Sequence, residues 1–246
     1  MDNFEQTKEQ INKQTGKIKK AWKWIWHSNS ILSWIVALLL MFIFVKFIFF
    51  PGLSLITGSS LPLAGVESSS MEHVATKYCK QFSSYNECLT YSDNYEICGN
   101  SFQTKKSFNF DNYWGECGNW YDTNNITKSE FSDFYFKNGF RKGDIMFVWG
   151  RFTPKVGDVI VFKPNKESLA PNPIIHRIVK IENINGQIII STKGDHNEKQ
   201  LHLNNNAYRT DETRITQEQV IGKAVFRIPY LGWVKLGFVK LVNLFR

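Results

Sequence analysis

The stretch IIHRIVKIENINGQIIISTKGD, residues 174–195, decides the fold class because it has the pattern of a β-hairpin. Two runs rich in β-branched residues flank Asn185-Gly186, a strong signature of a two-residue hairpin turn. Similar short runs separated by Gly, Pro, Asn and Asp lie before and after it: KGDIMFVW at 142–149, VGDVIVF at 156–162 and VIGKAVFRI at 220–228. No segment of helical period lies between these runs, so we expect a mainly β, antiparallel domain.

The hairpin also predicts a contact between two polar side chains. His176 lies nine residues before Asn185 and Asp195 nine residues after Gly186, so perfect two-residue pairing sets them opposite each other. Cross-strand partners have Cβ atoms about 4.5–5.5 Å apart, close enough for an imidazole–carboxylate contact. An imidazole oriented by a carboxylate is the base that makes a serine hydroxyl nucleophilic.

An apolar run near the N-terminus predicts a membrane anchor. Residues 31–50, ILSWIVALLLMFIFVKFIFF, are about as long as a helix needs to cross ~30 Å of hydrocarbon. We expect Pro51 and Gly52 to end this transmembrane helix. A cleaved signal peptide fits less well, because the run is too long for a signal h-region and no A-x-A-like site follows it closely.

Basic residues before the anchor predict its orientation. Residues 1–30 form a basic lead-in with six lysines: Lys8, Lys13, Lys17, Lys19, Lys20 and Lys23. Under the positive-inside rule this lead-in is cytoplasmic and the chain after residue 50 is extracytoplasmic, in a single-pass protein of the cell membrane. The net charge of +8 would suit nucleic acid, but most of the other basic residues are scattered among strand-like runs. We therefore expect the lipid bilayer and not nucleic acid as a partner.

All four cysteines lie beyond the anchor, in a segment of different composition. Residues 77–138, here called the insert, are rich in Tyr, Asn, Ser and Phe and contain Cys79, Cys88, Cys98 and Cys117. An even, clustered count outside a membrane predicts two disulfides, with three pairings open. Zinc is the alternative, although the chain has no C-x-x-C pair. His73, His196 and His202 match no familiar zinc spacing with Asp195, so we expect no metal and no cofactor.

Five short motifs follow the anchor in a fixed order: SSSMEH at 68–73, GDIMFV at 143–148, GDVIVF at 157–162, HRIV at 176–179 and KGDHN at 193–197. Together they resemble the type I signal peptidases of the archaeal and endoplasmic-reticulum type. VIGKAVFRIPYLGW, residues 220–233, is similar to the closing segment of that family. The resemblance covers the anchor, residues 60–73 and residues 140–233. It implies a serine endopeptidase that removes signal peptides from secretory preproteins.

The resemblance also implies roles for single residues. Ser70 would be the nucleophile, and Ser68 with the Ser70 amide would hold the oxyanion. His176 stands where the bacterial enzymes have a lysine base, and Asp195 matches the family's K-G-D aspartate. A second family aspartate corresponds best to Asp211. Lys180 and Lys193 lie in polar sequence without any sign of the burial that a lysine base requires.

The resemblance has two departures and leaves alternatives open. His73 replaces a family proline, and the insert separates Ser70 from the next motif. We expect a β catalytic domain in residues 51–76 and 139–229 and a membrane-apposed segment in 230–246. The protein translocation channel is a candidate partner. A disulfide-stapled surface protein without activity, or a peptidase for one dedicated substrate, remain alternatives.

Overall fold

The computed structural model describes residues 2–82, 88–170, 172–204 and 209–233. It has two compact units, Met1–Ile56 and Thr57–Arg246. The basic lead-in forms helix α1 (Asp2–His27). The apolar run forms α2 (Ile31–Phe44), which continues through a π-helical turn (Val45–Phe49) into α3 (Phe50–Thr57). Ile31–Thr57 is a candidate membrane span by its length and composition.

The expectation that Pro51 and Gly52 end this helix is wrong, because the helix runs on to Thr57. A proline inside an α-helix removes one hydrogen bond and clashes with the carbonyl four residues earlier. Here the π-helical turn comes directly before it, and the Phe50 N–H donates to the carbonyl of Val45, five residues back. The wider turn relieves the crowding that Pro51 would otherwise cause.

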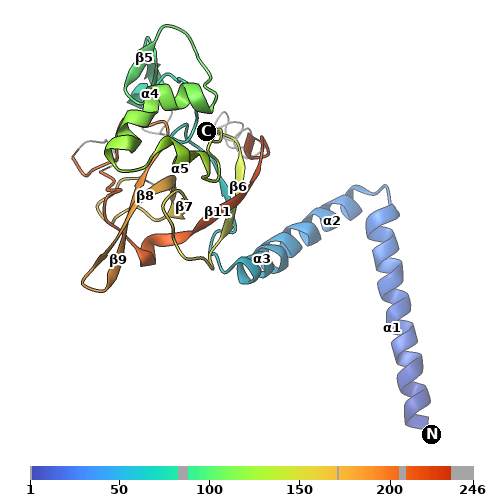
Figure 1. Cartoon of the computed structure of the whole chain (residues 1–246). Coiled ribbons are helices and arrows are strands. Elements are labelled where there is room, and N and C mark those ends of the chain that lie inside the picture. The colour runs from blue at the N-terminus through green and yellow to red at the C-terminus, as the bar shows by residue number, and fades with distance from the viewer. Residues whose placement is uncertain (1, 83–87, 171, 205–208, 234–246) are drawn as a thin grey trace. The chain divides into compact units, whose positions relative to one another are not determined.

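The second unit is built on a seven-stranded antiparallel sheet, which confirms the expected mainly β class (Figure 1). Its strand order is β1-β6-β11-β7-β8-β9-β10. β7 is buried along its whole length in the middle of the sheet. The strands are β1 (Leu63–Gly65), β6 (Ile145–Trp149), β7 (Val159–Phe162), β8 (Ile174–Ile184), β9 (Gln187–Lys193), β10 (Ile215–Thr216) and β11 (Val220–Ile228). A 3-10 turn (Gln217–Gln219) joins β10 to β11.

The β8–β9 hairpin has the expected turn but not the expected register. Asn185 and Gly186 both have positive φ, 53° and 83°, as the predicted two-residue turn requires. The pairing shifts by one residue at a bulge between Ile178 and Lys180, so Arg177 pairs with Lys193. A bulge adds one residue to one strand and changes which side chains face each other beyond it. The predicted pairing of His176 with Asp195 is therefore wrong.

The two Gly-Asp motifs make the same turn before β6 and β7, which follow each other in the chain and lie on either side of β11. Gly143 and Gly157 have φ of 89° and 93°, a conformation that glycine adopts without strain. Asp144 and Asp158 each accept a hydrogen bond from the main-chain N–H three residues earlier, at 2.9 and 3.1 Å. These aspartates shape the entry of β6 and β7.

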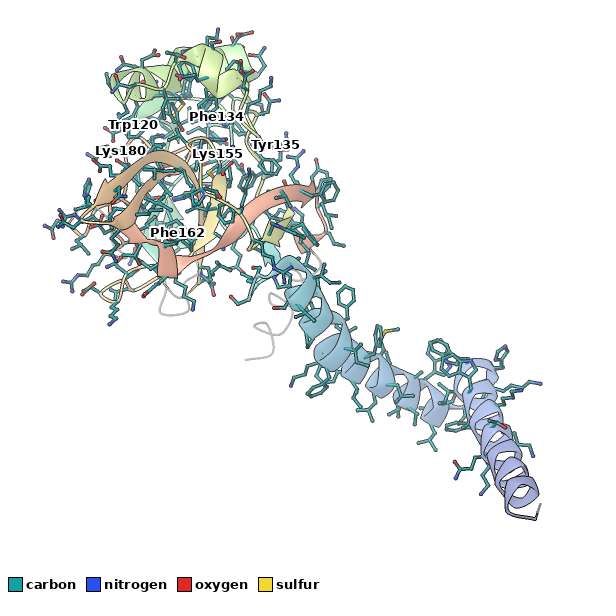
Figure 2. The ribbon with its side chains drawn as sticks, turned by 60° about the horizontal axis from the view of Figure 1, so that its bottom comes forward. Trp120, Phe134, Tyr135, Lys155, Phe162 and Lys180 are labelled. Carbon is teal, nitrogen blue, oxygen red and sulfur yellow. A yellow bond between two sulfur atoms is a disulfide. The ribbon has the colours of Figure 1, made fainter. Side chains whose placement is uncertain are left out.

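The insert carries two small ribbons and two helices, and it packs on the large sheet. An aromatic core formed by Phe108, Tyr113, Tyr121 and Phe131 of the insert also includes Val179 of β8. In Figure 2, Trp120 and Phe134 lie between the insert helices and the strands of the large sheet. The elements of the insert are β2 (Cys79–Phe82), β3 (Cys88–Tyr91), β4 (Tyr95–Ile97), β5 (Asn100–Phe102), α4 (Phe110–Thr123) and α5 (Lys128–Ser132).

Two disulfides bind the insert, as predicted, and all four sulfurs are used. Cys79–Cys88 joins β2 to β3, and Cys98–Cys117 joins the end of β4 to α4. This pairing argues against a zinc site made by the cysteines. Of the C-terminal segment 230–246, only residues 230–233 are described, and there Tyr230, Leu231 and Trp233 are exposed. The rest of that prediction lies outside the described residues.

Candidate active site

Ser70 lies in the turn that follows β1, within hydrogen-bond distance of a histidine. Its Oγ is 2.8 Å from Nε2 of His176, although 106 residues separate the two in sequence. The Oγ of Ser68 is 3.0 Å from the Oγ of Ser70. The structure thus brings together Ser68, Ser70 and His176, three residues that the sequence motifs predicted to lie in one site.

His176 stands on β8, opposite Ile160 of β7, and is almost fully buried. Its second ring nitrogen, Nδ1, contacts Oε1 of Glu212. An imidazole held in this way has a fixed orientation, and its Nε2 is left to face the serine hydroxyl. Ser70, His176 and Glu212 therefore form a continuous chain of side-chain contacts.

Glu212 is completely buried and is itself held in place. The Thr192 hydroxyl donates to its Oε1 at 3.0 Å, and the Leu201 N–H donates to its Oε2 at 2.8 Å. Its main chain runs beside β9, where the Thr192 N–H donates to the Glu212 carbonyl at 2.9 Å. A buried carboxylate needs such partners because burial of an unpaired charge is costly.

Asp195 has a different position from the one predicted, because it contacts Arg177 and not His176. The Nε and one terminal nitrogen of Arg177 donate to the two carboxylate oxygens at 2.9 and 2.7 Å. His73 contacts the same carboxylate at 3.2 Å, and the Tyr121 hydroxyl donates to it at 3.0 Å. Burial would raise the pKa of Asp195, but the adjacent Arg177 and His73 hold that pKa well below its ordinary value.

Arg177 follows His176 in sequence and points to the opposite face of the sheet, toward the insert. It is fully buried and donates further hydrogen bonds to the main-chain carbonyls of Tyr135, Phe136 and Gly157, at 2.9 to 3.0 Å. Its guanidinium also lies over the ring of Phe131, 4.7 Å from the centroid. Arg177 and Asp195 therefore form a structural ion pair beneath the site.

Sequence comparison relates the chain to named proteins. Signal peptidase complex catalytic subunit SEC11C of Homo sapiens is 33% identical over 100 residues, which are 39% of this chain and 49% of that protein. The SEC11 subunit of Candida tropicalis is 30% identical over 107 residues, 39% of this chain and 56% of its own length. The chain resembles the type I signal peptidases of the endoplasmic-reticulum type. It spans about half the length of the curated relatives that it matches. No family model matches the chain.

Asp211, the candidate for the second acidic residue of the signal peptidase pattern, contacts Thr213, whereas the next residue, Glu212, contacts His176. Asp211 accepts hydrogen bonds from the N–H and hydroxyl of Thr213, at 2.9 and 2.7 Å, and so shapes a turn. The neighbouring Glu212 makes the contact with His176. Asp211 was chosen because the family pattern has an aspartate. In the sequence, the adjacent acidic residues Asp211 and Glu212 were both visible as candidates.

Lys193 of the K-G-D motif is buried, which corrects the expectation drawn from its polar sequence. Its side chain is 0% exposed and its ammonium lies 4.9 Å from the centroid of the Tyr121 ring. Burial lowers the pKa of Lys193 to about 8, although Asp195 and Glu212 act in the opposite direction. Its ammonium donates to the carbonyl of Gly194 at 3.1 Å and not to Ser70. Lys180, by contrast, is exposed and pairs with Glu182.

Gly194 explains how closely this loop approaches the Ser70–His176 pair. A methyl group at this position would lie 2.8 Å from Nε2 of His176 and 2.8 Å from the carbonyl oxygen of Ser70. The N–H of His196, two residues further on, donates to the same carbonyl at 2.9 Å. The K-G-D motif of the signal peptidase resemblance therefore packs directly behind the nucleophile.

Proposed function

We propose that the chain is a membrane-bound serine endopeptidase that removes N-terminal signal peptides from exported preproteins. The observation that carries this proposal is the contact chain Ser70–His176–Glu212 in a protein related to signal peptidase subunits. A candidate membrane span precedes it and would keep the site near the bilayer, where signal peptides emerge.

In the proposed reaction Ser70 attacks the scissile carbonyl while His176 accepts its proton through Nε2. Glu212 orients the ring and stabilises the imidazolium that forms. His176 then gives the proton to the departing amine, and water releases the acyl group by the reverse sequence. The Ser68 hydroxyl and the Ser70 amide are the proposed oxyanion donors, because Ser68 stands directly beside the nucleophile.

A peptide in extended conformation suits the surface next to Ser70. β1 is the last strand on its side of the sheet, and residues 174–176 of β8 lie beyond the end of β9. Next to these stretches Asn172 donates to Glu67 at 2.9 Å, and Ile175 packs against the apolar cluster that also contains Ala64 of β1. We propose that the signal peptide adds as a strand between them, with small side chains before the cut.

The setting is proposed from the same features. The lysines of residues 1–30 favour a cytoplasmic N-terminus, with the β unit outside the membrane. Two disulfides suit an oxidising compartment. The bilayer, secretory preproteins and the protein translocation channel are then the proposed partners.

The experiment is cleavage of a preprotein by the purified full chain in detergent, with the product identified by mass spectrometry. We expect the parent to cut after the signal peptide and Ser70→Ala to lose at least about a thousandfold in rate. Ser69→Ala is the matched control, because Ser69 is the neighbouring serine of the same turn, and it should retain most activity. Equal rates for parent and Ser70→Ala would contradict the proposal.

A further inference from the structure

Helix α4 of the insert presents one face to the buried loop behind Ser70. Tyr113, Cys117 and Tyr121 follow at four-residue spacing and therefore share a face of the helix. Both tyrosines are 0% exposed. Figure 1 shows α4 on top of the large sheet, and its residue Trp120 is labelled at that junction in Figure 2.

Both tyrosine hydroxyls end on Asp195. Tyr113 donates to its main-chain carbonyl at 2.8 Å, and Tyr121 donates to its carboxylate at 3.0 Å. Burial, with the charge of Asp195, raises the pKa of both phenols well above their ordinary value, so both remain hydrogen-bond donors at working pH.

The same helix face also holds His73 and, through a disulfide, His196, two residues next to Asp195. The ring of Tyr113 stacks on His73 at 3.5 Å between centroids, and His73 contacts the Asp195 carboxylate. Cys117 is bonded to Cys98, whose N–H donates to the carbonyl of His196 at 2.9 Å. Contacts from the insert therefore reach both the loop and the segment after Ser70.

Movement of this loop would be transmitted to the nucleophile. The N–H of Asp195 contacts the sulfur of Met71 at 3.4 Å, and the N–H of His196 donates to the carbonyl of Ser70. Gly194 packs against both Ser70 and His176. The relative position of the serine and the imidazole thus depends on a loop that is held from the other side by α4.

We propose that Tyr113 and Tyr121 are positioning residues for the Ser70–His176 pair and act through Asp195. This inference rests on the proposed function and extends it, because it makes the insert part of the working enzyme. A displacement of about 1 Å in a catalytic group is enough to cost up to about a hundredfold in rate. Loss of one hydroxyl should therefore lower turnover while leaving the peptide-binding surface in place.

The test compares Tyr113→Phe, Tyr121→Phe and the double variant with the parent full chain in detergent. Each single change should lower kcat about tenfold and alter KM by less than about twofold. Because both hydroxyls act on Asp195, the double variant should lose less than the product of the two single losses. Tyr95→Phe is the matched control: its ring packs on the same aromatic core, and it should retain parental kcat.

The folded fraction of each variant is measured by near-UV circular dichroism, and kcat is expressed per folded molecule. Parental kcat per folded molecule in both single variants would overturn the positioning role, even if their yield were lower. If Tyr121→Phe does not fold, Tyr113→Phe decides alone, since its stack on His73 is kept. A folded parent that does not cleave the preprotein would instead contradict the proposed function.

Discussion

Two buried carboxylates near β8 differ in their partners, and the partner sets what each can do. Glu212 faces the imidazole of His176, whereas Asp195 faces the guanidinium of Arg177. Adjacent residues of a strand point to opposite faces, so the His176-Arg177 pair separates the two acids. Glu212 therefore has a part in the proposed reaction, whereas Asp195 stabilises the loop on the other face of β8.

The contact of Glu212 with His176 predicts different outcomes when Glu212 and its neighbour in sequence, Asp211, are replaced. Glu212→Gln should lower kcat by about 10³- to 10⁴-fold, because an amide can hold the imidazole in the wrong tautomer. Asp211→Asn should stay within about threefold of the parent, since Asp211 only shapes a turn with Thr213. Initial rates of preprotein cleavage decide this, and a greater loss in Asp211→Asn would reverse the assignment.

His196 predicts how stability depends on pH. Burial lowers the pKa of His196 in the folded state to about 4, whereas in the unfolded chain its pKa is about 6.5. Between these pH values the imidazole is neutral in the folded protein and protonated in the unfolded chain. The unfolded state then holds more protons between pH 6.5 and 4, and stability must fall as pH falls through that window. Comparison of denaturant unfolding at pH 7 and 4.5 should show a loss of stability in the parent, and this loss should be smaller by roughly 2 kcal/mol in His196→Gln. An equal loss in both proteins would refute this origin.

The sequence predicted the serine and the histidine of the candidate site but not the acid. Ser70 and His176 lie in short motifs that can be located without a structure. The acid depended on register, and the bulge after Ile178 moves Asp195 out of line with His176. The true neighbour, Glu212, follows a long connection whose path no local pattern specifies.

At the scale of elements, the hairpin turn and the hydrophobic pattern predicted the positions of most strands in the sheet. The Asn185-Gly186 turn and the runs that became β6, β7, β8, β9 and β11 all lie where the sequence indicated. The end of the candidate membrane helix was not predicted, because a π-helical turn accommodates Pro51. Packing of the insert on β8 was not foreseen either, since long-range aromatic contacts leave no periodic signal.

The two disulfides allow a comparison between elements. Their cysteines are 9 and 19 residues apart. Because the loop-closure entropy grows only with the logarithm of loop length, each should contribute about 3 kcal/mol through the unfolded state. Within the part of the chain that the structure describes, Cys98–Cys117 is the disulfide linked by a hydrogen bond to the loop behind Ser70. Replacement of Cys98 and Cys117 by Ser should lower kcat at least about fivefold, whereas replacement of Cys79 and Cys88 should leave it near parental. Equal activity of the two double variants at a temperature where both are folded would contradict this.

At the scale of the whole molecule, charge asymmetry predicts the topology. The lysines of residues 1–30 should hold the N-terminus in the cytoplasm. In right-side-out vesicles, added protease should therefore digest the β unit and spare the lead-in. Replacing Lys17, Lys19, Lys20 and Lys23 with Gln should give mixed orientations. Complete protection of residues 141–230 in the parent would show the opposite topology.

The place of β11 in the sheet has a consequence for how the protein is made. β11 is the latest strand in the described chain, yet it lies between β6 and β7, which are synthesised much earlier. Those two strands cannot acquire their shared neighbour until β11 has left the ribosome. The nascent chain therefore presents Ser70 long before a complete sheet can form around it. Under the proposed function, the growing chain would have no ordered site that could act on its own apolar segment, residues 31–50, until β11 has been made.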